Sequence, residues 1–315
     1  MSPAFLRRSA RAVTGFAAAA LALALTACGA AAPADEPEGG ADEGYTVTHA
    51  MGETTLDAVP ERIVVIDSPH LDALVSLGIT PVGATESGAS AGLPPYLGDA
   101  IADVEIVGLT AEPDIDAIAN LAPDLIIGAK VRHEAIYDEL SAIAPTVFSE
   151  NSGTDWREQA RITAAAVDRT DEMEELLAGI DERAAEIGEA IGASELTASM
   201  VRFRPDNFRL YGPQTFSGSL LAQVGFDLGE RDWDEYSMME LSPEQFEQID
   251  GDVVFYANPG GDPSATTMGT VTELWGSLPG VASGRAFEVE DETWMIGIGV
   301  TGANIVLDQL EEHLS

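Results

Sequence analysis

One amphipathic stretch near the middle of the chain constrains the fold more than any other feature of the sequence. Residues 154–192 repeat apolar side chains at helical spacing, and the opposite face is acidic. Thr170 is expected to cap a new helix after a break at residues 168–169. That helix would span about 22 residues, or roughly 33 Å at 1.5 Å per residue. It therefore predicts a stiff connection between the segments on either side.

Both flanking segments alternate short β-branched runs with helical patterns, which favours two α/β lobes with parallel strands. The first lobe is expected at residues 45–153, the connecting helices at 154–193 and the second lobe at 194–315. We expect strands at 62–67, 81–85, 124–128, 146–148, 198–204, 252–257 and 286–290, with an antiparallel return at 208–211. We expect helices at 70–78, 114–121, 132–143, 217–225, 242–249 and 302–314.

The first 27 residues have the features of an export signal in order. Three arginines form a positive start, an apolar run follows at 16–25, and then comes Cys28, the only cysteine. The apolar run is shorter than the roughly 20 residues that a spanning helix needs. Residues 25–28 resemble a bacterial lipobox, so we expect a lipoprotein signal peptide at 1–27 and a lipidated Cys28 at the mature N-terminus. An ordinary signal peptide with an incidental cysteine is the alternative.

Composition limits the partners of the chain. Residues 28–44 are rich in Ala, Pro, Gly and Glu, cannot bury a core, and are expected to form a flexible spacer. The formal net charge is −39, and it becomes −42 once residues 1–27, with three arginines and no acid, are removed. Such a charge repels nucleic acid and anionic lipid. We therefore expect no nucleic-acid partner, and contact with the outer face of the cytoplasmic membrane through the lipid anchor only.

The few cations gather where a ligand is expected. In open parallel sheets, ligands bind beyond the carboxyl ends of the strands. That rule selects His70, Lys130, Arg132, Arg202, Arg204 and Trp294, with Arg209 on the return strand as a weaker candidate. Clustered cations repel one another, which favours an anion between them. The planar fork of arginine suits carboxylate, hydroxamate and catecholate oxygens.

Each of these residues also has a structural explanation that the sequence leaves open. The cations can pair with the abundant acids, for example Arg202 with Glu240. Trp294 can belong to the core, and His70 can serve as a capping or hydrogen-bonded residue. His133 follows Arg132 at a helix start and is expected to be structural.

The order of export signal, acidic spacer, α/β lobe, long helix and second α/β lobe resembles the substrate-binding lipoproteins of ABC importers. Within them it is similar to the helix-backbone, or class III, periplasmic binding proteins, which have two Rossmann-like lobes. Several segments resemble the ferric-siderophore branch of this class: residues 61–83, 112–148, 202–212, 241–255 and 291–310. The most specific resemblance is that of GAKVRHEAIYDELSAIAPTV at 128–147. The resemblance implies a monomer that is no enzyme and has no permanently bound cofactor. It would capture a ferric siderophore between the lobes and deliver it to an ABC permease and its ATPase for iron uptake.

The resemblance also implies roles for single residues. Tyr236 would touch the ligand, and Asp116 and Glu244, each in the first turn of its expected helix, would dock onto arginines of the permease. Thr110 stands where many hydroxamate binders carry an arginine. The expected oxygen clamp then consists of Arg132, Arg202 and Arg204. This favours an anionic ferric citrate–hydroxamate or catecholate over a ferrioxamine.

Other functions remain as alternatives. Haem or cobalamin would suit the same fold, and His70 or a methionine would be the axial ligand of a haem. Direct metal binding is less favoured and no metal site is expected, because two of the four histidines, His49 and His313, lie near the ends of the folded region. A secreted enzyme is as little favoured as direct metal binding. Residues 215–219 lack the Gly-x-Ser-x-Gly pattern, and no catalytic residue is expected.

Overall fold

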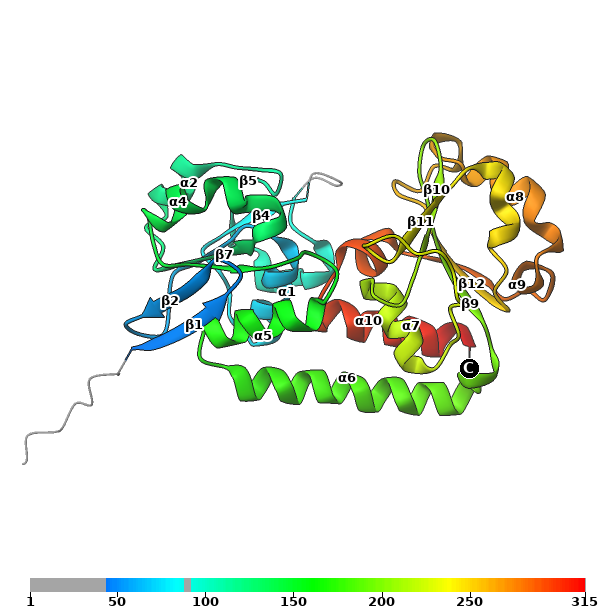
Figure 1. The fold of residues 1–315 in the computed structure, drawn as a ribbon, viewed down its shortest axis with the longest axis horizontal. Helices are drawn as coiled ribbons and strands as arrows, with labels where there is room; N and C mark the ends of the chain where they lie inside the picture. The colour runs from blue at the N-terminus through cyan, green and yellow to red at the C-terminus, as the bar shows by residue number, and fades with distance from the viewer. Residues whose placement is uncertain (1–43, 88–91, 315) are drawn as a thin grey trace, which may run out of the picture. The chain divides into compact units, whose positions relative to one another are not determined.

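The computed structural model describes residues 44–87 and 92–314, and Figure 1 shows two α/β lobes connected by α6 (Thr170–Ile191). The predicted fold class, two α/β lobes joined by a long helix, is confirmed. The predicted signal peptide, the lipidated Cys28 and the spacer up to residue 43 lie outside the described residues. Within the part of the chain that the structure describes, no helix is both long and apolar enough to cross a membrane.

The first lobe contains a six-stranded sheet in the order β6-β5-β4-β3-β7-β8, parallel except for edge strand β6. Its central strands are buried throughout, because they are covered on both faces. The strands are β3 (Ile63–Val65), β4 (Gly83–Glu86), β5 (Glu105–Leu109), β6 (Glu112–Pro113), β7 (Leu125–Ala129) and β8 (Thr146–Ser149). The helices are α1 (Ser68–Ser76), α2 (Ile115–Asn120), α3 (Lys130–His133) and α4 (Tyr137–Ser141), with a 3-10 segment at Pro95–Ile101. An antiparallel hairpin, β1 (Tyr45–His49) and β2 (Gly52–Leu56), precedes them and was not predicted.

The second lobe contains a five-stranded sheet in the order β11-β10-β9-β12-β13. Strands β9, β12 and β13 are parallel, and β10 returns antiparallel to β9 as predicted. The strands are β9 (Ala198–Phe203), β10 (Phe208–Tyr211), β11 (Met238–Leu241), β12 (Val253–Ala257) and β13 (Ala286–Val289). The helices are α7 (Phe216–Val224), α8 (Met268–Leu274), α9 (Pro279–Ala282) and α10 (Val300–Leu314), and a π-helical turn lies at Glu292–Ile296.

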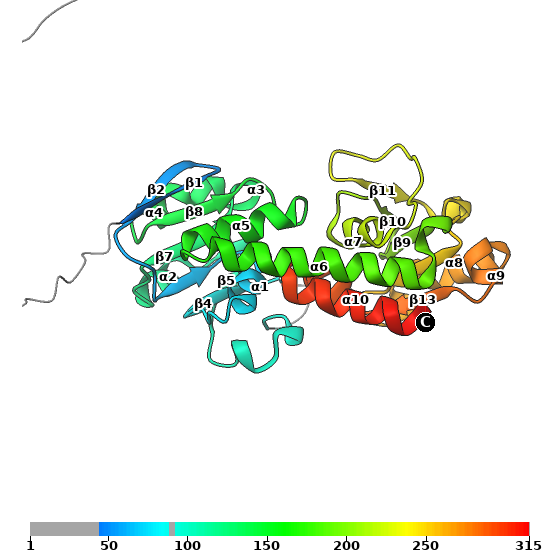
Figure 2. The same cartoon turned by 90° about the horizontal axis from the view of Figure 1, so that it is seen from below.

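The connecting helices share one apolar core with both lobes. α5 (Trp156–Ala166) packs on α1, and α10 packs on both α1 and α6. Figure 2 shows α6 and α10 side by side, as Figure 1 does. One buried cluster runs from Leu74 of the first lobe through Ile180 of α6 and Leu307 of α10 to Phe255 of the second. The helices that link the lobes are therefore packed against both, and do not act as a loose tether.

The break before α6 is confirmed, but its predicted cap is wrong. α6 has the 22 residues expected and follows Asp168, which is in the left-handed region at φ 53°. Thr170 is its first helical residue, and the capping position belongs to Arg169, which makes no side-chain capping bond. The acids Asp171 and Glu172 in the first turn suit the positive end of the helix dipole instead.

Two predicted helices have a different form. The helix expected at 132–143 is broken into α3, a 3-10 turn at Glu134–Ile136 and α4. The break lets His133 turn inward, where its Nδ1 accepts from the Ala129 backbone and its Nε2 lies 2.9 Å from the Thr110 carbonyl. The helix expected at 242–249 is a kinked 3-10 segment, Pro243–Gln248, which begins with a capping box between Ser242 and Gln245.

Candidate ligand-binding site

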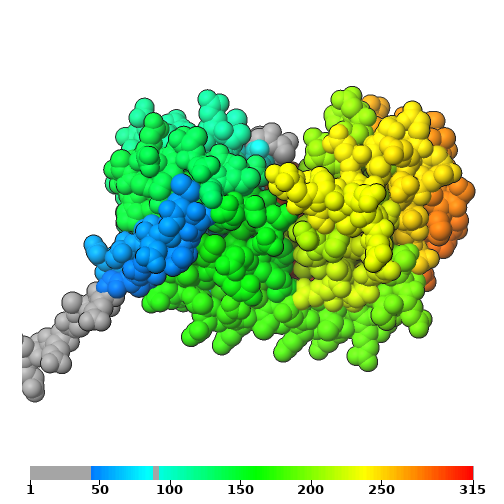
Figure 3. Space-filling model, in the orientation of Figure 1, coloured from blue at the N-terminus to red at the C-terminus, as the bar shows by residue number. Residues whose placement is uncertain are grey.

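A cavity of about 140 Å³ lies beside the second sheet, where β10 ends and β11 begins. The first lobe contributes the loop after β8 to its wall, and the second lobe contributes the end of β10, the start of α7 and the π-helical turn. In Figure 3, the yellow surface of the second lobe lies next to the green surface of the first on the face drawn. The residues that line the cavity are Ser152, Gly153, Thr154, Tyr211, Thr215, Phe216, Ser217, Tyr236, Met238, Trp294, Met295 and Ile298.

Four aromatic residues, one of them Phe216, give the cavity its apolar character. Tyr236 is 44% exposed, so its ring is available to a ligand. Trp294 is fully buried, stacks on Phe255 at 5.1 Å between ring centroids and donates from Nε1 to Gln309 Oε1 at 2.7 Å. The tryptophan thus belongs to the core and to the cavity wall at once. Tyr211, at the end of β10, also lines the cavity.

Two arginines stand beside Tyr211. Arg202 on β9 and Arg209 on β10 are direct cross-strand partners, an arrangement that would be repulsive without counter-ions. Arg202 Nη2 donates to Asp291 Oδ2 at 2.6 Å, and Arg209 Nη2 donates to Glu240 Oε2 at 2.8 Å. Burial opposes the charge of both guanidiniums, but the two carboxylates and the Tyr211 phenol outweigh it and raise the pKa of each arginine.

Arg204 differs from its neighbours. It is half-buried just beyond the end of β9, and its backbone bonds to Asn207 and Thr267. Within residues 44–87 and 92–314, its side chain has no hydrogen bond and no ion pair. Arg204 is therefore the one cation of the predicted cluster that needs no internal bond to be broken before it binds an anion.

The predicted cations of the first lobe are paired with acids. Lys130 Nζ lies 3.0 Å from Glu150 Oε1. Arg132 Nε lies 3.2 Å from the buried carboxylate of Asp67. The Nη2 of Arg132 also donates to Ser152 Oγ at 3.3 Å, and Ser152 lines the cavity. Arg132 thus reaches the cavity edge through Ser152, whereas Lys130 is tied to a surface acid.

His70 lies in the interior and does not line the cavity. It is 1% exposed, with Nδ1 2.7 Å from Thr163 Oγ1 and Nε2 3.1 Å from Ser149 Oγ. Burial lowers the pKa of His70 to about 4, against partial opposition from the Asp67 carboxylate. Both ring nitrogens are occupied by neighbouring hydroxyls, so this histidine ties α1 to α5 and β8.

The two predicted docking acids lie on the surface. Asp116 is in the first turn of α2 and Glu244 is in the first turn of the 3-10 segment after β11, and both are exposed. Bonds from its own backbone N–H and from the Ser242 hydroxyl lower the pKa of Glu244. Each acid is therefore available to an outside cation.

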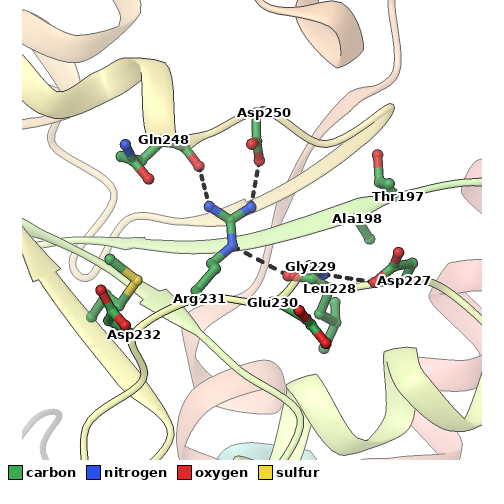
Figure 4. A pocket seen from close by; sticks show the side chains of 11 residues that line it. Thr197, Ala198, Asp227, Leu228, Gly229, Glu230, Arg231, Asp232, Gln248 and Asp250 are labelled. Atoms are coloured by element: carbon green, nitrogen blue, oxygen red, sulfur yellow. Dashed lines mark hydrogen bonds and ion pairs between the residues drawn. The ribbon is translucent and has the colours of Figure 1, made fainter.

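A larger hollow of about 590 Å³ lies at the amino end of β9, where Thr197 and Ala198 line it (Figure 4). The one cation in its lining, Arg231, already has partners inside the protein. It donates to the carbonyls of Leu228 and Gln248 and to the Asp250 carboxylate. The remaining charged residues of the lining are acids, so the hollow does not suit an anion. Among the described residues, no three or more His, Cys, Asp or Glu side chains gather as metal ligands.

Sequence reasoning missed part of the cavity. The loop 152–154, Ser217 and Met238 were not predicted, because only the folded chain brings the end of β8 to the start of α7. Tyr211 could have been found, since it follows Arg209 by two positions and thus shares its face of strand β10.

Comparisons with known proteins agree with this geometry. The profile of the family described as "Periplasmic binding protein" matches residues 63–293. The chain is 37% identical over 305 residues to the probable siderophore-binding lipoprotein YfiY of Bacillus subtilis, covering 92% of this chain and 94% of that one. It is 30% identical over 250 residues to the Fe(3+)-citrate-binding protein YfmC of the same organism, covering 77% of each. The crystal structure of Staphylococcus aureus SirA complexed with staphyloferrin B has a TM-score of 0.74 and 29% identity, covering 86% of this chain and 98% of that one.

Proposed function

Because this chain belongs to the periplasmic binding protein family, we propose that it captures a ferric siderophore and delivers it to an ABC permease for iron uptake. The observation that carries the proposal is the cavity where β10 ends and β11 begins, which Tyr211, Tyr236 and Trp294 line and where the Tyr211 phenol lies next to Arg202 and Arg209. The printed names of the relatives support it, since YfiY is a probable siderophore-binding lipoprotein and YfmC binds ferric citrate.

The size of the cavity indicates how such a ligand would lie. Pockets for small molecules usually enclose about 300–1,000 Å³, and this cavity holds about 140 Å³. A siderophore would fill it with one part and extend over the rim with the rest. Arg132 reaches the cavity edge through Ser152, and Arg204 lies beyond the end of β9 with its guanidinium unbonded among the described residues. Charge-assisted bonds from the extended ligand to these cations, of about 1.5–3 kcal/mol each, would add to the aromatic contact. We propose an anionic siderophore of the citrate, citrate–hydroxamate or catecholate type.

The surroundings of the protein follow from the same proposal. We propose a monomer tethered through a lipidated Cys28 to the outer face of the cytoplasmic membrane, as the lipoprotein names of YfiY and a second relative suggest. Asp116 and Glu244 would dock onto cations of the permease, which works with its ATPase. Their exposure in first turns supports this role.

We expect tryptophan fluorescence of the purified protein to fall when ferric dicitrate, a ferric citrate–hydroxamate or a ferric catecholate is added. Trp294 borders the cavity, so a coloured ferric complex bound there should quench it. The dissociation constant should lie between about micromolar and nanomolar, equivalent to roughly −8 to −12 kcal/mol. The measurement is a fluorescence titration, with ferrichrome, haem and cobalamin as further ligands.

Two variants assign the signal. Trp294→Phe keeps an aromatic ring against Phe255 and should lose most of the quenching. Trp275→Phe is the matched control, because Trp275 packs in a separate core cluster and does not line the cavity. Binding of haem or cobalamin without any response to a ferric siderophore would refute the proposal. His70 is unsuited to be an axial haem ligand, since both ring nitrogens contact hydroxyls inside the protein.

Arg204→Ala should weaken the binding of an anionic ferric siderophore at least tenfold without lowering the melting temperature. The reason is that the guanidinium of Arg204 makes no bond within the described chain, so its loss removes only ligand contacts. Arg285→Ala is the control: it removes the same charge from an exposed residue at the amino edge of the sheet. Equal weakening by both variants would indicate only a long-range charge effect. A lower melting temperature with unchanged affinity would give Arg204 a structural role.

A further inference from the structure

The ion pair between Arg202 and Asp291 lies next to Tyr211, which lines the cavity. Arg202 is at the end of β9, next to the Tyr211 phenol, and Asp291 precedes the π-helical turn that carries Trp294. The two side chains keep 18% and 11% of their surface exposed, and Nη2 lies 2.6 Å from Oδ2. The pair thus lies behind the lining residue Tyr211 and close in sequence to the lining residue Trp294.

The pair is only half made. An arginine and a carboxylate can form two parallel bonds, one from Nε and one from Nη2. Here the second bond is missing: Nε of Arg202 and Oδ1 of Asp291 are both buried and have no partner among the described residues. A pair held by one bond is easier to open than a bidentate pair. Buried donors are normally hydrogen-bonded. A ligand oxygen that bonded the unpaired Nε of Arg202 would therefore be favoured.

Asp291 reduces the repulsion between two neighbouring arginines. Arg202 faces Arg209 across the strands, and Glu240 neutralises Arg209 as Asp291 neutralises Arg202. Without the two acids, the paired guanidiniums would form a strong site for any small anion. Glu240 is more than half exposed, whereas Asp291 is shielded from solvent beside the cavity. Asp291 is therefore the acid that acts at short range on what enters.

We propose that Asp291 is a specificity-determining residue, which occupies Arg202 and excludes small free anions from the cavity. Only a ligand that combines oxygen acceptors with aromatic contact would gain enough to displace the carboxylate from Nη2. This inference rests on the proposed function, because it assumes that the cavity is the ligand site. If the inference is correct, the protein discriminates a ferric complex from the same chelator without iron.

Isothermal titration calorimetry with iron-free citrate tests the proposal. The wild-type protein should show no binding at millimolar citrate, whereas Asp291→Asn, which keeps the shape and removes the charge, should bind it at least tenfold more tightly. Asp291→Ala should behave in the same way, and no capping bond is lost because the Asp291 side chain makes none. Asp308→Asn is the control: it neutralises a largely exposed acid that pairs with Arg183 on the connecting helix.

The outcomes separate this inference from the proposed function. Unchanged citrate binding in both Asp291 variants, or a lower melting temperature as their only effect, would make Asp291 a structural counter-ion and overturn the inference. Tight citrate binding by the wild-type protein would overturn it as well. Failure of the wild-type protein to bind any ferric complex would instead refute the proposed function. The fluorescence titration of the wild-type protein measures this binding and needs no Asp291 variant.

Discussion

Gly188→Ala is expected to destabilise the protein by about 3 kcal/mol or more, although alanine is the better helix former. Gly188 is buried in α6, and an added Cβ would lie 1.9 Å from the carbonyl oxygen of Val224, the last residue of α7. The obstacle is backbone, so no side chain can rotate away. Either α6 and α7 separate or the end of α7 unwinds. Chemical denaturation followed by circular dichroism measures the loss.

Gly179→Ala is the matched control within the same helix. Gly179 is exposed and an added Cβ would meet nothing within 4 Å. Removing a flexible glycine from a helix interior should stabilise the protein by about 0.5–1 kcal/mol. The same substitution in one helix is thus predicted to have opposite signs at two positions nine residues apart. Similar effects at both positions would show that α6 and α7 do not make the close approach described.

The sequence predicted the fold well where the signal is local. The apolar repeat of residues 170–191 determines a helix whose length was correct, since each turn presents the same face to the core. The helix at 132–143 failed because its form depends on a distant contact. His133 reaches the Thr110 carbonyl, and this contact requires a break in the helix. The helix propensities of the residues at 132–143 do not predict that break.

The candidate site shows the same division. Strand ends and their cations could be found from the sequence, but not the acid that meets each cation. Glu240 was considered for Arg202, whereas the strand register places it opposite Arg209. The partner of Arg202 is Asp291, 89 positions later in the chain. Such pairings depend on the order of strands in the sheet, which the alternation of helices and strands does not determine.

A buried acid holds the two lobes together. Asp72 on α1 accepts hydrogen bonds from the backbone of Thr301 and Gly302 at the start of α10, at 2.9 and 3.0 Å, and from the Tyr96 hydroxyl at 3.0 Å. A negative charge is favourable at this end of a helix. Gly299 leaves the room, since a Cβ there would lie 2.3 Å from the Asp72 carboxylate. α1 of the first lobe thus caps the closing helix of the second.

Asp72 and His70, two positions apart on α1, titrate in opposite senses. Burial raises the pKa of Asp72 from 3.8 to about 6, although its hydrogen bonds favour the carboxylate. The folded protein therefore takes up this proton before the unfolded chain does, and Asp72 adds stability as the pH falls from 7 to 4. Burial lowers the pKa of His70 from 6.5 to about 4, so here the unfolded chain takes up the proton first. His70 removes stability over nearly the same range.

We expect the two effects to cancel in the wild-type protein and to separate in variants. Each shift of roughly two pH units corresponds to about 3 kcal/mol. Asp72→Asn should lose about 3 kcal/mol of unfolding free energy, relative to wild type, between pH 6.5 and pH 4, because the variant lacks the proton uptake by which Asp72 stabilises the wild type. His70→Gln should gain a similar amount relative to wild type as the pH falls from 7 to 4. The measurement is denaturant unfolding at each pH, taken as the difference from wild type so that the other carboxylates drop out.

The double variant, Asp72→Asn with His70→Gln, tests whether these two groups alone cause the pH-dependent differences. With both groups removed, its stability should run parallel to that of the wild type, at a constant offset for the lost bonds at Thr301 and Thr163. Each of the two hydroxyl neighbours of His70 also lies within hydrogen-bond distance of a backbone carbonyl, Thr163 of Gln159 and Ser149 of Asn151. A neutral His70 can donate to only one hydroxyl, so the other must turn its proton from its carbonyl to the ring. If His70 instead keeps its proton in the folded state, His70→Gln will show no gain relative to wild type as the pH falls from 7 to 4. The pH profile thus distinguishes a neutral histidine inside the first lobe from a buried cation, and it does so without any ligand.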